Sequence, residues 1–242
     1  MPWYFAVIEG EHELQNPTSS DKVRLLGERL GLRPGTRLLD VASGRGGPAV
    51  LLASAFGCRV TCIEQAEEFD RVARERAHAA GVGALIEHLH ADAARVPFEP
   101  EAFDAAMCLG ASFIWGGLGG TLAALSPAVR SGGYVAVGEP YWRTWPLPEG
   151  CDPEGADYAT LPETVGRFGA AGLVPVALID ASLDDWDRYE SLHWRTAERW
   201  LRDHPHDPAA PGIRARYERD RDRYLRWQRD LMGWAIIAGR KP

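Results

Sequence analysis

Residues 37–47 read RLLDVASGRGG, and this stretch decides the fold. An apolar run ends in Asp40 and passes at once into a glycine-rich turn, the pattern of a buried parallel strand that leads into a loop and a helix. Gly44 and Gly46 let the backbone approach a ligand closely, and the helix that begins near Pro48 directs its N-terminal amides to the same place. The stretch therefore predicts a strand–turn–helix unit that binds a nucleotide or a carboxylate.

Strand patterns and helix patterns alternate on both sides of this stretch. Further strands are expected at 59–63, 85–90, 103–109, 134–138, 174–180 and 234–239. Helices are expected at 18–30, 67–80, 118–129, 162–171, 184–203 and 209–231, besides the one that begins at 48. This alternation predicts an α/β fold with a parallel sheet covered on both faces. We expect a single domain, 1–242, with an N-terminal lid segment at 1–17, an irregular loop at 141–155 and a helical insertion or cap at 184–230.

Composition narrows the class of protein. Of the 242 residues, 45% are hydrophobic and 25% are charged, which is typical of a globular chain. The net charge of −7 argues against a nucleic acid or an anionic membrane as the main partner. The four cysteines show neither a CxxC pair nor a metal-ligand spacing, so no metal site is expected. The absence of a signal-peptide pattern and of an apolar run near 20 residues favours a cytoplasmic location.

Further acids follow the next two strands of the pattern. Glu64 ends its strand eighteen residues after Gly46, a spacing at which a carboxylate can accept hydrogen bonds from ribose hydroxyls. Asp92 follows the third strand, so that with Asp40 three acids meet at the carboxyl edge of the sheet, where open α/β sheets bind ligands. The Gly-x-Gly-x-x-Ala spacing at 44–49 also satisfies the dinucleotide fingerprint, so a NAD(P)-dependent oxidoreductase has to be weighed.

These residues resemble the class I S-adenosylmethionine-dependent methyltransferases, and among them the bacterial small-molecule enzymes. Asp40 with the glycines at 44–46 is similar to that family's first motif, Glu64 to its ribose-binding acid and Asp92-Ala93 to the pair that reads adenine. The resemblance covers about residues 18–140. It implies a Rossmann-like sheet of order 3-2-1-4-5-7-6 with an antiparallel last strand, S-adenosyl-L-methionine as cofactor and S-adenosyl-L-homocysteine as product. The cofactor-binding residues it implies are Asp40, Ala42, Ser43, Gly44, Gly46, Glu64, Gln65, Asp92, Ala93 and Cys108.

Two other branches of the family fit the sequence less well. Residues 108–112 read CLGAS, without the Asn/Asp-Pro-Pro-aromatic motif that amino-methylating DNA enzymes usually carry. Arsenite methyltransferases use several loop cysteines, whereas only Cys151 falls in an expected loop. We therefore predict methyl transfer to a small-molecule acceptor by in-line displacement. A non-catalytic S-adenosylmethionine-binding regulatory module and the oxidoreductase are the alternatives.

Acceptor-side residues have to reach the transferred methyl group. Glu139 follows the fifth strand at the carboxyl edge and is the first candidate to orient or deprotonate the acceptor. His193, on an aromatic helix face, and His12, near the N-terminus, are further candidates. The residues expected to contact the acceptor are Tyr4, Trp115, Tyr141 and Trp142. Seven tryptophans outside the expected core strands predict an acceptor with an aromatic or apolar part: Trp3, Trp115, Trp142, Trp145, Trp186, Trp194 and Trp200.

Overall fold

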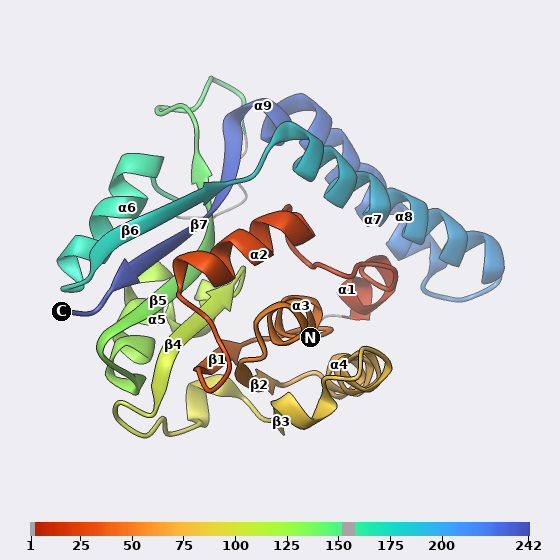
Figure 1. The fold of residues 1–242 in the computed structure, drawn as a ribbon. Helices are drawn as coiled ribbons and strands as arrows, with labels where there is room; N and C mark the ends of the chain where they lie inside the picture. Colours follow the sequence, from red (N-terminus) through yellow and green to blue (C-terminus); the bar gives the residue numbers. More distant parts are fainter. Residues whose placement is uncertain (1–2, 152–157) are drawn as a thin grey trace.

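Seven strands form one mixed sheet in the computed structural model, which describes residues 3–151 and 158–242 (Figure 1). The strands are β1 Arg37–Val41, β2 Arg59–Glu64, β3 Ile86–His90, β4 Phe103–Leu109, β5 Val129–Trp142, β6 Val174–Asp180 and β7 Met232–Arg240. Their order is β3-β2-β1-β4-β5-β7-β6. The pairs among β1 to β5 are parallel, and β7 is antiparallel to both β5 and β6. The predicted fold class and strand order are confirmed.

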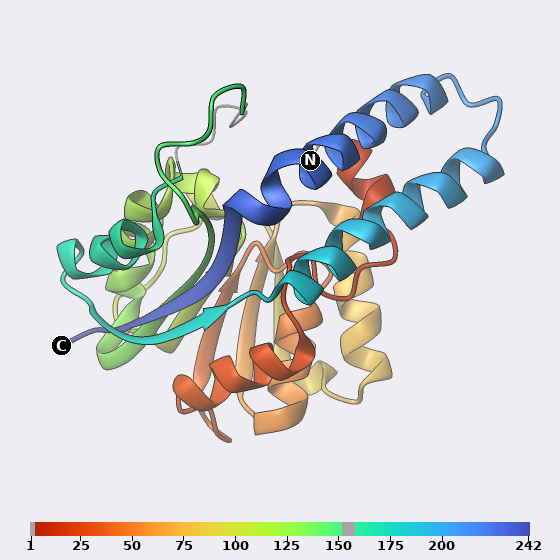
Figure 2. The same ribbon diagram turned by 90° about the horizontal axis from the view of Figure 1, so that it is seen from above.

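Helices cover both faces of this sheet (Figure 2). They are α1 Trp3–Ile8, α2 Ser20–Arg29, α3 Gly47–Phe56, α4 Glu67–Ala79, α5 Leu118–Leu125, α6 Leu161–Ala170, α7 Leu183–Asp203, α8 Ala210–Arg223 and α9 Arg229–Leu231. Because side chains alternate along a strand, neighbouring residues enter different cores. Leu38 and Met107 pack in the cluster that contains α2 and α3, whereas Leu39 and Cys108 pack in the cluster that contains α5 and α6.

Strand β5 is longer than the sequence pattern indicates. It continues past Gly138 to Trp142, and its last two residues, Tyr141 and Trp142, pair with Gly233 and Met232 of β7. The expected irregular loop at 141–155 therefore begins with strand residues, and its positions 152–155 lie outside the described residues. The antiparallel partner supplies hydrogen bonds that a parallel neighbour ending at Leu109 could not, which explains the extension.

Helices α7 and α8 form an antiparallel hairpin that projects beyond the end of the sheet (Figures 1 and 2). Helix α1 packs against it, and Tyr4 and Ile8 share an apolar cluster with Ala197 of α7 and Tyr217 of α8. A capping box at Ser182 begins α7. No helix among the described residues is long and apolar enough to cross a membrane.

Candidate functional site

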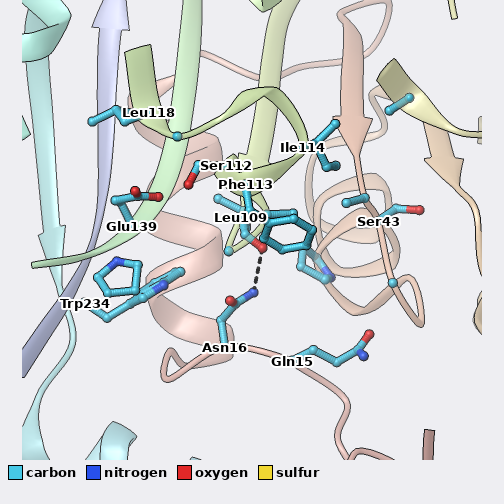
Figure 3. A pocket seen from close by; sticks show the side chains of 18 of the residues that line it. Gln15, Asn16, Ser43, Leu109, Ser112, Phe113, Ile114, Leu118, Glu139 and Trp234 are labelled. Carbon is cyan, nitrogen blue, oxygen red and sulfur yellow. Dashed lines mark hydrogen bonds between the residues drawn. The ribbon is translucent and has the colours of Figure 1, made fainter. Parts of the chain in front are cut away.

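A cavity of about 1200 Å³ opens at the carboxyl ends of the parallel strands. Sites for one drug-sized ligand measure roughly 300–1,000 Å³, so this cavity has room for a cofactor and a second molecule. The glycine loop and the ends of β1, β2 and β4 form one part of it, and β5, β7 and α7 form another. The N-terminal segment, residues 9–17, contributes Gln15, Asn16 and Pro17 to the wall (Figure 3).

The acids at the ends of β1 and β2 lie together at one end of the cavity. Asp40 is 2% exposed, and its Oδ2 atom has no hydrogen-bond partner among the described residues. Burial, and then the charge of Glu64, raises the pKa of Asp40 to about 8. Glu64 accepts hydrogen bonds from the backbone amides of Gly44 at 2.9 Å and Ala66 at 2.8 Å. The two carboxyl groups therefore differ, since Glu64 is braced by the backbone and Asp40 keeps a free oxygen.

Eight of the ten predicted cofactor residues line this cavity: Asp40, Ala42, Ser43, Gly44, Glu64, Gln65, Asp92 and Ala93. Asp92 begins the short 3-10 turn Ala93–Arg95 and accepts a hydrogen bond from the amide of Ala94 at 3.0 Å. The hydroxyl of Ser43 is buried without a hydrogen-bond partner in the described part of the chain. This end of the cavity thus offers several polar atoms that a bound molecule can satisfy.

Gly46 and Cys108 do not line the cavity. Gly46 has φ +77°, and a Cβ there would lie 2.8 Å from the Cβ of Ala73, so this glycine lets α3 and α4 pack closely. Cys108 is fully buried in the core on the α5 side, where burial raises the pKa of its thiol to about 12. The alternation along β4 turns the Cys108 side chain away from the cavity, and Leu109 takes the predicted place.

The glycines of the loop admit the protein's own N-terminal segment. A Cβ at Gly44 would overlap Oε1 of Gln15, and a Cβ at Gly110 would overlap Oδ1 of Asn16. Gln15 Oε1 accepts a hydrogen bond from the amide of Arg45 at 2.6 Å. Asn16 Nδ2 donates to the carbonyl of Leu109 at 3.0 Å (Figure 3). The sequence predicted a close approach by a ligand, and it missed this contact because Gln15 and Asn16 carry no motif.

Glu139 lies on β5, just beyond the point at which the pairing of β4 with β5 ends. Strand β4 ends at Leu109, opposite Gly138, so Glu139 is the first β5 residue beyond that end. It is 6% exposed, lines the cavity beside Ser112 and Trp234, and its Oε2 atom has no hydrogen-bond partner among the described residues (Figure 3). Burial raises the pKa of Glu139, and this rise is opposed by Ser112 and by the charge of Arg167.

The β5 extension places two residues that the sequence predicted as acceptor contacts outside the cavity lining. Tyr141 and Trp142 are held in the strand and do not line the cavity. The hydroxyl of Tyr141 donates to Asp180 at 2.8 Å, and its ring covers Gly233. Trp142 is buried in the core cluster on the α2 and α3 side. The β5 residues that line the cavity are Glu139 and Pro140, which come just before Tyr141.

Two other residues predicted to contact the acceptor, Tyr4 and Trp115, do not line the cavity, whereas their neighbours Phe5 and Ile114 do. Tyr4 faces α8, where its hydroxyl donates to Asp220 at 3.1 Å, and its neighbour Phe5 lines the cavity. Trp115 packs at the edge of the α5 core, and its neighbour Ile114 lines the cavity. In both places the difference concerns which side of a short helical turn faces the cavity, and that depends on the packing partner rather than on the residue type.

His12 and His193 lie behind the cavity wall rather than on it. Their rings are 4.3 Å apart, between the N-terminal segment and α7. Burial and the charge of His193 lower the pKa of His12 to about 4. Burial alone would lower the pKa of His193, but Glu190 and Glu9, each 3.8 Å from its ring, outweigh burial and raise the pKa to about 9. Neither imidazole is placed to touch an acceptor, whereas Glu9 and Glu190 line the cavity.

The tryptophans divide differently from the prediction. Of the seven expected around the acceptor, Trp186 lines the cavity, while the side chain of Trp3 lies outside what the structure describes. Trp145 is exposed beside a separate surface pocket. Trp234, which the sequence places in a core strand, lines the cavity next to Glu139. The cavity therefore has an aromatic lining, which consists in part of Phe5, Trp186 and Trp234 rather than of the predicted group of seven tryptophans.

A sheet of this order, with a glycine loop and acids at its carboxyl edge, defines a nucleotide-type cofactor site of the methyltransferase kind. Residues 39–137 match the protein family described as "Methyltransferase domain". Protein YjhP of Escherichia coli strain K12 is 36% identical over 98% of each chain. The crystal structure of an S-adenosylmethionine-dependent methyltransferase from Geobacter sulfurreducens with S-adenosyl-L-homocysteine is 34% identical, with TM-score 0.93 over 100% of this chain and 99% of the other.

The chain belongs to the class I S-adenosylmethionine-dependent methyltransferases. It is an enzyme that uses S-adenosyl-L-methionine, and neither the regulatory-module hypothesis nor the oxidoreductase hypothesis is favoured. A more distant relative is similar over most of its length: the 27-O-demethylrifamycin SV methyltransferase of Amycolatopsis mediterranei is 28% identical, covering 95% of this chain and 85% of the relative.

Proposed function

We propose that this enzyme methylates a small-molecule acceptor that binds between Glu139 and the α7–α8 hairpin. The observation that carries the proposal is the carboxyl group of Glu139, which is buried in the wall of the cavity and has one oxygen without a hydrogen-bond partner among the described residues. A buried polar atom without a partner costs free energy unless a bound molecule satisfies it. A hydroxyl, an amine or an acidic carbon of the acceptor would supply the hydrogen that Glu139 lacks.

The cofactor end has groups that fit S-adenosylmethionine. Asp40 and Ser43 present buried oxygens that have no hydrogen-bond partner within residues 3–151 and 158–242, and they are assigned to its methionine part, where an ammonium group can donate to them. Glu64, held by two backbone amides, is assigned to the ribose hydroxyls, and Asp92 with Ala93 to the adenine. This assignment follows the family resemblance residue by residue, and the shared cavity supports it.

Glu139 and the residues near it are proposed to align and deprotonate the acceptor. The bound cofactor supplies an electrophilic methyl group on a sulfonium, so the protein must mainly align the acceptor with it. Glu139 holds the acceptor's donor atom and takes its proton. Burial favours the neutral form of Glu139 and so makes its carboxylate a stronger base than an exposed one. Ser112 and the charge of Arg167 oppose this rise in the pKa of Glu139.

The acceptor is assigned an aromatic or apolar part. Phe113 is 73% exposed although it lines the cavity, and Trp186 and Trp234 lie on the wall as well. An exposed ring of this size at a cavity is typical of a ligand contact. The rifamycin relative acts on a small organic molecule, which supports this class of acceptor. The acidic net charge and the hollowed site favour a small molecule over a nucleic acid.

The N-terminal segment and the hairpin are proposed to act as the lid (1–17) and the cap (184–230) of the same domain. Gln15 and Asn16 contact both loops that border the cofactor end. Trp186, Tyr189 and Glu190 of α7 form the opposite wall. Residues 1–2 of the lid lie outside the described residues. A cytosolic location stays a prediction.

Glu139→Gln tests the proposal with a matched control, Glu218→Gln, at an exposed position of α8. The dissociation constant of S-adenosyl-L-homocysteine is measured by calorimetry, and methyl transfer is measured with a panel of hydroxylated and aminated aromatic acceptors. We expect Glu139→Gln to bind the product normally and to lower kcat by roughly 100- to 10,000-fold, the usual contribution of a general base. A full kcat in Glu139→Gln would remove its role, and binding of the product without transfer to any acceptor class would favour a non-catalytic module.

A further inference from the structure

A set of charged groups lies between α7 and the N-terminal segment at the edge of the cavity: Glu9 and Glu190 line the cavity, and His12 and His193 lie behind its wall. His193 of α7 lies 3.8 Å from Glu9 through Nε2 and 3.8 Å from Glu190 through Nδ1. The hydroxyl of Tyr189 donates to the same Glu9 carboxylate at 3.3 Å. Glu9, His12 and His193 are all buried. Because charged groups are costly to bury, such a set is kept only where its members neutralise and orient one another.

Glu9 connects this set to the glycine loop. Its second oxygen, Oε2, accepts a hydrogen bond from Gln15 Nε2 at 2.6 Å. The other end of the same amide, Oε1 of Gln15, accepts the backbone N–H of Arg45 at 2.6 Å. The two ends of one amide side chain are thereby fixed, which also fixes the direction of its Oε1 atom. The contact falls at Gly44, where any Cβ would collide with it.

We propose that His193 and Glu9 are positioning residues that orient Gln15 onto the glycine loop, so that the hairpin and the N-terminal segment complete the cofactor site. The proposal rests on the cofactor end described under the proposed function. It gives the predicted candidate His193 a different task. His193 pairs with the Glu9 carboxylate, and Glu9 accepts a hydrogen bond from the Gln15 side chain. Gln15 in turn accepts a hydrogen bond from the backbone N–H of Arg45, next to Gly44.

The groups that face His193 determine its charge. The carboxylates of Glu9 and Glu190 favour the imidazolium, and His12 lies against the ring from the N-terminal segment. The ring of Tyr189 also packs against the His193 ring. The backbone carbonyl of Tyr189 lies 3.0 Å from His12 Nε2, so the same residue contacts both imidazoles. His193 carries its proton below a pKa of about 9, and His12, with a pKa of about 4, stays neutral at pH 7. The ion pair with Glu9 is therefore present at neutral pH and is lost as the pH rises through about 9.

A second clamp limits how far the segment can move. Arg76 of α4 donates to the carbonyls of His12 at 3.0 Å, Glu13 at 3.2 Å and Arg45 at 3.2 Å. These contacts do not involve His193. Loss of the His193 charge should therefore disorient Gln15 without releasing the segment, which predicts a moderate loss of affinity rather than unfolding.

A double-mutant cycle tests the connection by calorimetric titration of the whole chain with S-adenosyl-L-homocysteine. Gln15→Ala is expected to weaken binding about tenfold, the size of one oriented hydrogen bond, and His193→Gln about fivefold, the size of one ion pair. Because His193 acts through Gln15, His193→Gln should change the affinity less than twofold in the Gln15→Ala background. His204→Gln, at the exposed end of the same helix, is the control and should bind as the wild type does.

The pH dependence separates a positioning role from a merely structural one. Between pH 8 and 10 the wild type should lose affinity more steeply than His193→Gln, while titration of the ligand itself affects both proteins equally. Effects that multiply in the double variant, or an unchanged affinity in His193→Gln, would overturn the proposal. If His193→Gln does not fold, Glu9→Gln replaces it in the cycle, since it keeps the shape and removes the charge. A wild type that fails to bind the ligand would instead overturn the cofactor site itself.

Discussion

Asp40 offers a direct measure of how strongly burial at the cofactor end disfavours a charge, and Asp40→Asn is the substitution that isolates this effect. In an unfolded chain the Asp pKa is about 3.9. In the folded protein burial, and then the charge of Glu64, raises the pKa to about 8. Between these values the folded state holds a proton that the unfolded state has lost, so the free energy of unfolding falls as the pH rises. From pH 5 to pH 7 this loss is about 3 kcal/mol, at about 1.4 kcal/mol per unit.

Denaturant unfolding of the ligand-free wild type and of Asp40→Asn at pH 5, 6 and 7 measures this loss. All other groups titrate in both proteins, so the difference between their unfolding free energies reports Asp40 together with its coupling to Glu64. Asn is neutral at every pH, and we expect Asp40→Asn to gain about 3 kcal/mol relative to the wild type over that range. Parallel pH curves for the two proteins would refute the reasoning, because they would show that Asp40 is solvated or paired in the folded state.

Two further predictions concern the same loop. Glu64→Gln loses a charged acceptor for the amides of Gly44 and Ala66, and we expect S-adenosyl-L-homocysteine to bind roughly 10- to 100-fold more weakly by calorimetry; an unchanged dissociation constant would contradict the ribose assignment. Gly46→Ala puts a Cβ at positive φ against α4 and should lower the unfolding free energy by about 1–3 kcal/mol. The open helical position Gly166 is its control, since Gly166→Ala should raise that free energy by about 0.5–1 kcal/mol, and equal effects at both positions would remove the steric explanation.

The strand order and most of the cofactor end could be predicted because their signals are local. Asp40, Glu64 and Asp92 each stand at the end of an apolar run, and parallel strands bring such ends to one edge. Strand alternation is equally local, and applied strictly it would have placed Cys108 in the core, on the same face as Ala106. The assignment of Cys108 to the cofactor followed the family's motif and did not take this alternation into account.

The acceptor end could not be predicted in the same way, because its residues depend on contacts between distant segments. The length of β5 is set by β7, almost a hundred residues later, and that pairing removes Tyr141 and Trp142 from the cavity. The inward turn of Phe5 instead of Tyr4 depends on where α8 lies, since Tyr4 is drawn to Asp220. The residue types favoured the more polar aromatic residue, Tyr4, as an acceptor contact, whereas packing places its neighbour Phe5 on the cavity wall.

The N-terminal segment shows why a glycine motif alone is an incomplete guide to a site. The loop glycines are needed twice, once for the turn that presents backbone amides and once for contact with Gln15 and Asn16. Asn16 also donates a hydrogen bond to the carbonyl of Leu109, so the segment connects the glycine loop with the loop that follows β4. A molecule that enters this end must fit beneath a segment already anchored to α7 and α4, so binding there and closure of the segment are thermodynamically linked: whatever loosens one weakens the other.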